Sequence, residues 1–203
     1  MKIIGFPRSR AIRALWAAEE AGVPYEVEWI DPRKLASPEF RTLNPAGKVP
    51  VLVDGDLVLS ESAAICTWLG QKAPDKALVP REGTPEWGRY LQFCFFVLSE
   101  LEQPLWLWAK HKFALPRAVR VEGLGPAVEH EWTRYTQVVE SALNGRPYLV
   151  GDHFTIADLL TAQTLDWGHG LGHALSEPLE AWTRTQCARP ALARARAVDK
   201  SGG

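Results

Sequence analysis

The feature that most constrains the fold of this chain is the stretch NPAGKVPVLVDGDLVLSESAAI, residues 44–65. Two apolar runs, VPVLV and LVL, flank Asp-Gly-Asp, which is a strong hairpin signal. A proline cannot donate a hydrogen bond to a β-ladder, so Pro50 belongs at the first residue of a strand or at a sheet edge. The stretch therefore predicts a hairpin over 51–59 that opens at a proline, followed at once by a helix over 61–71.

The residues before this hairpin predict an α/β unit. KIIGF and YEVEWI read as short strands on either side of a helix in SRAIRALWAAEEAG, which Gly22 and Pro24 end. SPEFRTLN reads as a short irregular helix ahead of the hairpin. The resulting order, β-α-β-α-β-β-α, fits a mixed sheet covered by helices.

The rest of the chain reads as helical. Apolar residues recur at helical spacing from Trp87 to Trp108, with a kink expected at Pro104. Thr155 and Asp158 form a capping-box pattern at the start of another helix. Further helices are expected over 117–143, near 176–187 and over 190–198.

A stretch rich in proline and charge, 73–85, reads as a linker between these two regions. The pattern therefore predicts an N-terminal domain over 1–76, a linker over 77–84 and an all-α helical domain over 85–203.

Composition excludes several classes of function. The net charge of -1 offers no electrostatic basis for binding nucleic acid. No apolar run is long enough to span a bilayer, and MKIIGF does not resemble a signal peptide. Cys66, Cys94 and Cys187 are odd in number and widely spaced, which fits neither a disulfide framework nor a metal site and favours a reducing cytoplasm. We expect no metal, no membrane association and no nucleic-acid partner.

Two polar features adjoin the hairpin. A cis bond between Val49 and Pro50 would present the main chain of Val49 to an extended peptide ligand, although Pro50 could equally just open the strand. Glu61 and Ser62 stand where the next helix begins. They could simply cap that helix, with Ser60 as N-cap. Alternatively, free N–H groups and the Ser62 hydroxyl could bind a carboxylate while Glu61 pairs with an ammonium, which together match the head of an α-amino acid.

A third polar feature is Arg8-Ser9-Arg10, where the first strand turns into the first helix. Ser9 is either an ordinary N-cap or a hydroxyl aimed at a bound thiol. A cysteine-type thiol has a pKa of about 8.5, which a helix N-terminus, a hydroxyl donor and arginine charge could each lower. The thiolate is the competent nucleophile, so stabilising it at neutral pH would be the catalytic task.

These motifs resemble a known family. GKVPVL, LSESAAI and GDHFTIADL look like the three signature stretches of cytosolic glutathione transferases. PRSRAIRALWAAEEAGVPYE is similar to the first strand and helix of bacterial and fungal members with an S-R-x-x-R-x-L-W pattern. The resemblance covers essentially the whole chain in the right order. It implies a thioredoxin-like N-terminal domain, an α-helical bundle as C-terminal domain, a homodimer and a role in detoxification.

The resemblance also implies roles for residues that bind glutathione. Val49 would pair with the cysteinyl backbone of glutathione through the bend at cis-Pro50, and Glu61 and Ser62 would hold the γ-glutamyl head. Lys48 would reach the glycyl carboxylate, or would be a solvated loop lysine. Thr155 and Asp158 match the family's capping box, with a role in folding.

The catalytic position departs from the family pattern. Many members place a tyrosine at the end of the first strand, but here that strand ends in Gly5-Phe6-Pro7, and no cysteine lies near the first helix. Ser9 is then the nearest hydroxyl, with Arg8 and Arg10 as rival donors to the thiol.

A pocket for the second substrate is expected in EQPLWLWAKHKFALP. Trp106, His111 and Phe113 could line it, although each could instead pack in the core or a dimer interface. The predicted function is a glutathione transferase whose thiolate attacks hydrophobic electrophiles and could also start peroxide or disulfide reduction. The alternative is a non-catalytic module of the same fold that binds glutathione or other proteins.

Overall fold

The N-terminal part of the computed structural model, which describes residues 1–202, is built on a four-stranded mixed sheet in the order β2-β1-β3-β4. Strand β1 pairs in parallel with β2 and antiparallel with β3, and β3 pairs antiparallel with β4. The bounds are β1 Lys2–Gly5, α1 Ala11–Ala21, β2 Glu26–Trp29, η1 Pro32–Ala36, α2 Pro38–Leu43, β3 Val51–Asp54, β4 Leu57–Leu59 and α3 Ser62–Gln71. The predicted order, the hairpin and the thioredoxin-like fold class are confirmed.

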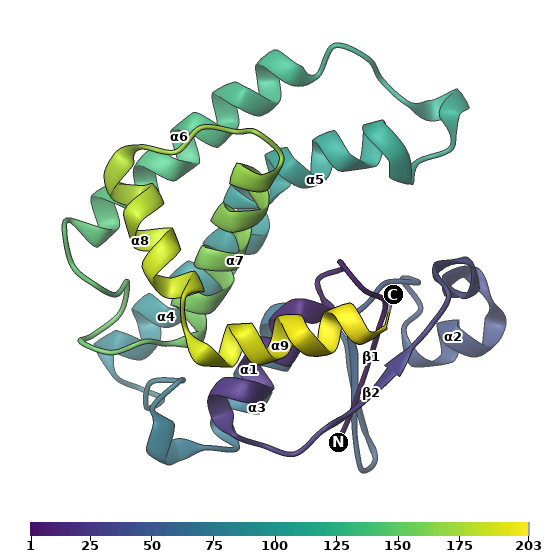
Figure 1. Cartoon of the computed structure of the whole chain (residues 1–203), viewed down its shortest axis with the longest axis horizontal. Helices are drawn as coiled ribbons and strands as arrows, with labels where there is room; N and C mark the ends of the chain where they lie inside the picture. Colours follow the sequence, from purple (N-terminus) through teal and green to yellow (C-terminus); the bar gives the residue numbers. More distant parts are fainter. Residues whose placement is uncertain (203) are drawn as a thin grey trace.

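The two faces of the sheet are covered by different helices, because successive side chains of a strand point to opposite faces. Ile3 and Leu52 belong to the main core, which α1 and α3 also supply. Ile4 and Val51 form a smaller cluster with Phe40 of α2 on the other face. Figure 1 shows α1 and α3 side by side and α2 set apart from them.

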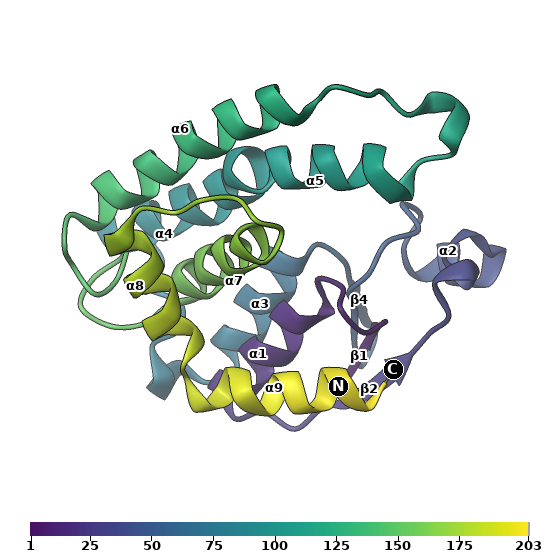
Figure 2. The same cartoon turned by 45° about the horizontal axis from the view of Figure 1, so that its top comes forward.

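The rest of the described chain is helical. It contains η2 Pro74–Lys76, α4 Pro85–Phe96, η3 Val97–Leu101, α5 Gln103–Ala109, η4 Lys110–Ala114, η5 Arg117–Val119, α6 Gly125–Leu143, α7 Ile156–Gly170, α8 Glu177–Cys187 and α9 Pro190–Ser201. Figure 2 shows α5 and α6 running side by side, joined at one end by a long connecting segment. The all-helical second half is confirmed.

Two of the predicted helices differ in detail. Pro104, where a kink is expected, occupies the first turn of α5, just after the π-helical segment η3 ends. The helix predicted over 117–143 is wrong in its first part. It begins only at Gly125, because Gly123 adopts a positive φ of 78° and Pro126 fits the start of a helix but not its interior.

Helix α9 returns from the helical part to pack along α1 (Figures 1 and 2). Arg189, the N-cap residue of α9, pairs with Glu20 of α1 at 2.6 Å, and Arg194 within α9 pairs with Glu19 at 2.5 Å. At the far end of α9, Asp199 accepts a hydrogen bond from the backbone N–H of Arg8 at 3.1 Å. The turn that carries the predicted catalytic residues is therefore held from the C-terminal end of the chain.

None of the helices in residues 1–202 combines the length and the hydropathy that crossing a bilayer would require.

Candidate functional site

The loop before β3 is shaped by its own residues. Asn44 folds it by accepting from the N–H of Ala46 at 3.1 Å and donating to the carbonyl of Lys48 at 2.7 Å. Gly47 has a φ of 62°, and a Cβ there would lie 2.9 Å from the carbonyl oxygen of Leu35, so the position requires glycine. The Val49–Pro50 bond is cis, as the functional interpretation of the sequence predicted.

The start of α3 provides a second part of the site. Glu61, not Ser60, is the N-cap residue, with a φ of 68° that non-glycine residues adopt rarely, and no side-chain hydrogen bond caps the helix. The predicted Ser60 cap is therefore wrong. The N–H groups of the first turn keep their capacity to bind an anion. Glu61 is exposed, and the Ser62 side chain beside it is buried.

The turn between β1 and α1 provides the third part. The Ser9 hydroxyl donates to the carbonyl of Phe6 at 2.6 Å and accepts from the N–H of Ala11 at 3.2 Å. Arg8 is exposed, with a φ of 61° and its N–H bonded to Asp199. The single hydrogen of the Ser9 hydroxyl is therefore donated within the turn itself.

These parts meet at one small pocket of about 120 Å³. Its lining is Arg10, Asn44, Lys48, Val49, Pro50, Glu61, Ser62, Leu98, Glu102, Gln103 and Trp106. All five residues predicted to bind glutathione therefore face one cavity, together with Arg10 and Trp106. Arg8 and Ser9 are not among the lining residues.

Two cations, Arg10 and Lys48, line this pocket, and Arg10, which forms an ion pair with Glu102, is the more buried of them. Its guanidinium carbon lies 4.6 Å from the ring centroid of Trp106 and 5.7 Å from that of Trp167, and Lys48 Nζ lies 5.9 Å from the Trp106 centroid. Burial lowers the pKa of Arg10, and the nearby Glu102 carboxylate opposes that shift. Arginine still carries its charge at neutral pH. Its Nε is buried and has no hydrogen-bond acceptor within residues 1–202.

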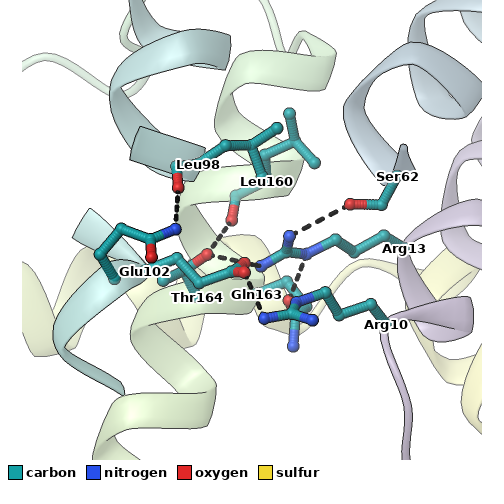
Figure 3. Close-up of polar contacts among 9 residues, drawn as sticks. Arg10, Arg13, Ser62, Leu98, Glu102, Leu160, Gln163 and Thr164 are labelled. Atoms are coloured by element: carbon teal, nitrogen blue, oxygen red, sulfur yellow. Dashed lines mark hydrogen bonds and ion pairs between the residues drawn. The ribbon is translucent and has the colours of Figure 1, made fainter. Parts of the chain in front are cut away.

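A buried ion network lies behind the pocket (Figure 3). Glu102 pairs with Arg10 at 2.6 Å and with Arg13 at 2.5 Å. Burial by itself would raise the pKa of Glu102, but the charges of Arg13 and Arg10 and their hydrogen bonds outweigh it and lower the pKa below its ordinary value. Glu102 is therefore an ionised carboxylate held between two guanidinium groups.

The residues predicted to line the pocket for the electrophile do not lie together in the structure. Trp106 lines the pocket with the glutathione residues. His111 lines a different cavity of about 610 Å³ beside the segment that joins α5 to α6, where its Nδ1 accepts from the N–H of Val121 at 2.9 Å. Phe113 is 63% exposed. The structure does not bring His111 or Phe113 to the pocket.

Sequence reasoning assigned no role to Arg13, Glu102 or Asn44. Arg13 is the second arginine of the S-R-x-x-R pattern, and its completely buried side chain could not be foreseen from an amphipathic helix alone. Glu102 follows an apolar helical run, which is the one local signal of a buried acid. Asn44 opens the NPAG turn, which signals a loop but not a ligand.

The three cysteines lie outside the pocket. Cys66 and Cys94 are buried, and burial raises the pKa of the Cys94 and Cys187 thiols to about 12. Within residues 1–202, no group of three or more His, Cys, Asp or Glu side chains could hold a metal ion. The expectation of a metal-free site remains a prediction.

The capping box predicted at α7 is present. Asp158 accepts from the N–H of Thr155 at 2.9 Å and from its hydroxyl at 2.9 Å. The other carboxylate oxygen accepts from the N–H of Leu149 at 2.8 Å. Asp158 is fully buried and does not line the pocket, which agrees with a role in folding.

The fold and site together define a two-domain class of protein, in which a thioredoxin-like sheet with a cis-proline loop shares one polar pocket with a helical domain. Family models support this class over both parts of the chain. The glutathione S-transferase N-terminal domain matches residues 9–72, and the glutathione S-transferase C-terminal domain matches residues 103–190.

Individual relatives agree. Glutathione S-transferase GST-4.5 of Xanthomonas campestris pv. campestris is 32% identical over 158 residues, which is 76% of this chain and 76% of that protein. The structure of BphK, a bacterial glutathione S-transferase in a ternary complex, superposes with a TM-score of 0.87 at 27% identity over 98% of this chain and all of that one. A sphingomonad glutathione S-transferase complexed with glutathione gives 0.86 at 25% identity, covering 98% and 99%.

The chain belongs to the glutathione S-transferase family, and it is an enzyme, a glutathione transferase. The family prediction made from the sequence is confirmed.

Proposed function

We propose that the pocket binds glutathione, ionises its thiol beside Arg10 and presents the thiolate to a hydrophobic electrophile. The observation that carries the proposal is the convergence of Lys48, Val49, Glu61 and Ser62 on one cavity with Arg10. Glutathione bound to a solved relative supports the choice of ligand. The thiol proton would leave to solvent, and the thiolate would then form a bond to an electrophilic carbon. Either a leaving group would depart from that carbon with its electron pair, or the electron pair of a π bond would move to the neighbouring atom and take up a proton from solvent.

Each part of the pocket suits one part of the tripeptide. The main chain of Val49, turned outward by the cis bond, would pair with the cysteinyl backbone. The uncapped first turn of α3 and the Ser62 hydroxyl would bind the γ-glutamyl carboxylate, and exposed Glu61 would pair with its ammonium. Lys48 would reach the glycyl carboxylate.

Arg10 is the favoured donor to the thiolate. It lines the pocket, keeps its charge and has an Nε without an acceptor in the described part of the chain, whereas the Ser9 hydroxyl is already donated to Phe6. A fixed positive charge beside a thiol lowers its pKa. Ser9 then shapes the turn, and Arg8 extends into solvent.

The second substrate would rest on Trp106. That ring lies over Arg10, and Leu98 adds apolar surface to the same cavity. His111 and Phe113 would contribute only if the segment that joins α5 to α6 moved toward the pocket. Reduction of peroxides or disulfides by the same thiolate, which would convert glutathione into its disulfide, stays a prediction.

Binding is tested with immobilised glutathione and by calorimetry. The wild type should be retained on glutathione-agarose and released by free glutathione. Replacing Glu61 by alanine should weaken binding about tenfold, since a hydrogen bond to a charged group contributes about 1.5–3 kcal/mol. Glu86→Ala, an exposed acid in the first turn of α4, is the matched control. Equal affinities of the Glu61 variant and the wild type would contradict the ammonium role.

The donor to the thiol is tested by ultraviolet titration of the bound thiolate. We expect Arg10→Gln to raise the apparent pKa of bound glutathione by about one unit or more, which corresponds to about 1.4 kcal/mol of lost stabilisation of the thiolate. Ser9→Ala should move it less. The reverse order of the two shifts would assign the task to Ser9.

The remaining expectations are also proposals. The domain division at 77–84 is supported by the absence of regular elements between η2 and α4.

A homodimer is supported by the exposure of Phe95 on α4, at 67%, and of Val58 on β4, at 43%. Sedimentation at several protein concentrations would test this oligomeric state. A cytoplasmic location is supported by the free cysteines.

A further inference from the structure

Arg13 lies directly behind the wall of the pocket formed by the start of α3. Its side chain is 0% exposed, and it projects from α1 between the two domains (Figure 3). Each nitrogen has a partner: Nε donates to Gln163 at 2.5 Å, Nη1 to the Ser62 hydroxyl at 3.3 Å, and Nη2 to Thr164 at 2.8 Å. Nη2 also pairs with Glu102. The fork of the guanidinium is therefore fixed on all sides, which only arginine can provide.

The hydrogen bond from Arg13 to the Ser62 hydroxyl restricts the direction of the hydroxyl hydrogen. A serine hydroxyl has one hydrogen to donate and two lone pairs that accept. Because Arg13 occupies a lone pair from the protein side, the hydrogen is directed elsewhere, and no acceptor for it is found among residues 1–202. Ser62 lines the pocket while being only 5% exposed. An acceptor placed in the pocket is thus the natural partner of this hydrogen.

The charge behind Ser62 strengthens the same preference. Arg10, Arg13 and Glu102 carry two positive charges and one negative charge, which leaves a net positive charge of one at the back of the pocket. A hydroxyl that accepts from a buried guanidinium becomes a better donor, because chained hydrogen bonds polarise one another. The pocket is therefore prepared for an anion at Ser62 before any ligand arrives.

We propose that Arg13 is a positioning residue for glutathione, which holds the Ser62 hydroxyl so that its hydrogen faces the γ-glutamyl α-carboxylate. Arg13 does not touch glutathione itself. It acts through Ser62, and Glu102, Gln163 and Thr164 hold it in place from the helical domain. This inference rests on the proposed function. It implies that the helical domain supports the carboxylate subsite indirectly, through Arg13 and Ser62.

The test compares two peptides by calorimetry: glutathione, and 4-aminobutyryl-cysteinyl-glycine, which keeps the ammonium but lacks the α-carboxylate. We expect Arg13→Met to bind glutathione about tenfold more weakly than the wild type and to bind the analogue within twofold of the wild type. In a Ser62→Ala background Arg13→Lys, which keeps the positive charge, should have no further effect on glutathione binding. Thr161→Val is the matched control, because Thr161 is a buried α7 threonine whose hydroxyl, among residues 1–202, bonds only to the carbonyl of Ala157.

Arg13→Lys is the second variant in case Arg13→Met does not fold. It keeps the charge, but its single nitrogen cannot occupy both the Nη1 position beside Ser62 and the Nη2 position beside Glu102. It should show the same selective loss. Equal losses for both peptides would overturn the inference in favour of a purely structural role, as would unchanged binding of glutathione or additive losses with Ser62→Ala. A wild type that binds glutathione but does not distinguish the two peptides would also overturn it. A wild type that binds neither peptide would overturn the proposed function itself.

Discussion

Replacing Glu102 by glutamine should destabilise the protein more than any exposed ion pair could. The substitution keeps the shape of the side chain but removes the only negative charge between Arg10 and Arg13 within the network. Removing one partner of a buried pair costs about 3–5 kcal/mol, because the other charge stays buried and uncompensated. Arg13 is 0% exposed but keeps three neutral acceptors, so we expect the lower end, about 3 kcal/mol.

Urea unfolding at a fixed protein concentration measures this loss. The signal is tryptophan fluorescence, since Trp16 and Trp132 are both completely buried. With a slope near the upper value for small proteins, about 3 kcal/mol/M, the midpoint should fall by about 1 M. In a thermal scan, a chain of this size should lose about 6–12 °C.

A matched exposed pair serves as the control. Glu28 pairs with Lys2 at 2.9 Å, with side chains 49% and 44% exposed, so Glu28→Gln should cost at most about 1 kcal/mol. A loss below about 1 kcal/mol for the Glu102 variant would refute the reasoning, because the buried charges would then not depend on this carboxylate.

The same carboxylate predicts a pH dependence. The pKa of folded Glu102 lies below its ordinary value, so its stabilisation is complete above the pKa of an unfolded glutamate, about 4.3. It is lost as the pH falls through the lower folded value. The gap in stability between wild type and Glu102→Gln should therefore be constant near neutral pH and shrink below about pH 4. A gap that widens with acid would contradict this.

Two further substitutions test other parts of the fold. Asp158→Ala should cost at least about 2 kcal/mol in thermal unfolding, because the buried N–H groups of Leu149 and Thr155 both lose their acceptor. Burial raises the pKa of Asp158 to about 6, so folding favours its protonated form. The stability difference between the wild type and Asp158→Ala should therefore widen as the pH falls from 7 to 5, and a constant difference would contradict the shift. Gly5→Ala should cost about 1–3 kcal/mol by the same assay, since its Cβ would lie 2.5 Å from that of Ala11, and an unchanged melting temperature would show that α1 shifts freely.

The sequence by itself determined the features that depend on neighbours along the chain. Apolar runs on both sides of Asp-Gly-Asp specify the hairpin, and Thr155 with Asp158 specifies the start of α7, because turn and cap chemistry acts over a few residues. The same local reading placed Glu61 and Ser62 at a helix start next to the loop of Pro50. It was wrong at the start of α6, because apolar spacing does not show that Gly123 adopts a positive φ ahead of the helix.

Only the tertiary structure decided which of these local features meet. Ser9 and Arg10 are adjacent in sequence, yet one hydroxyl is bonded within its turn while the other side chain lines the pocket. Arg13 and Glu102 are 89 positions apart by their numbers and form one ion pair, which no spacing rule relates. Burial and charge pairing depend on how two domains pack, and a linear pattern holds no information about contacts made across that interface.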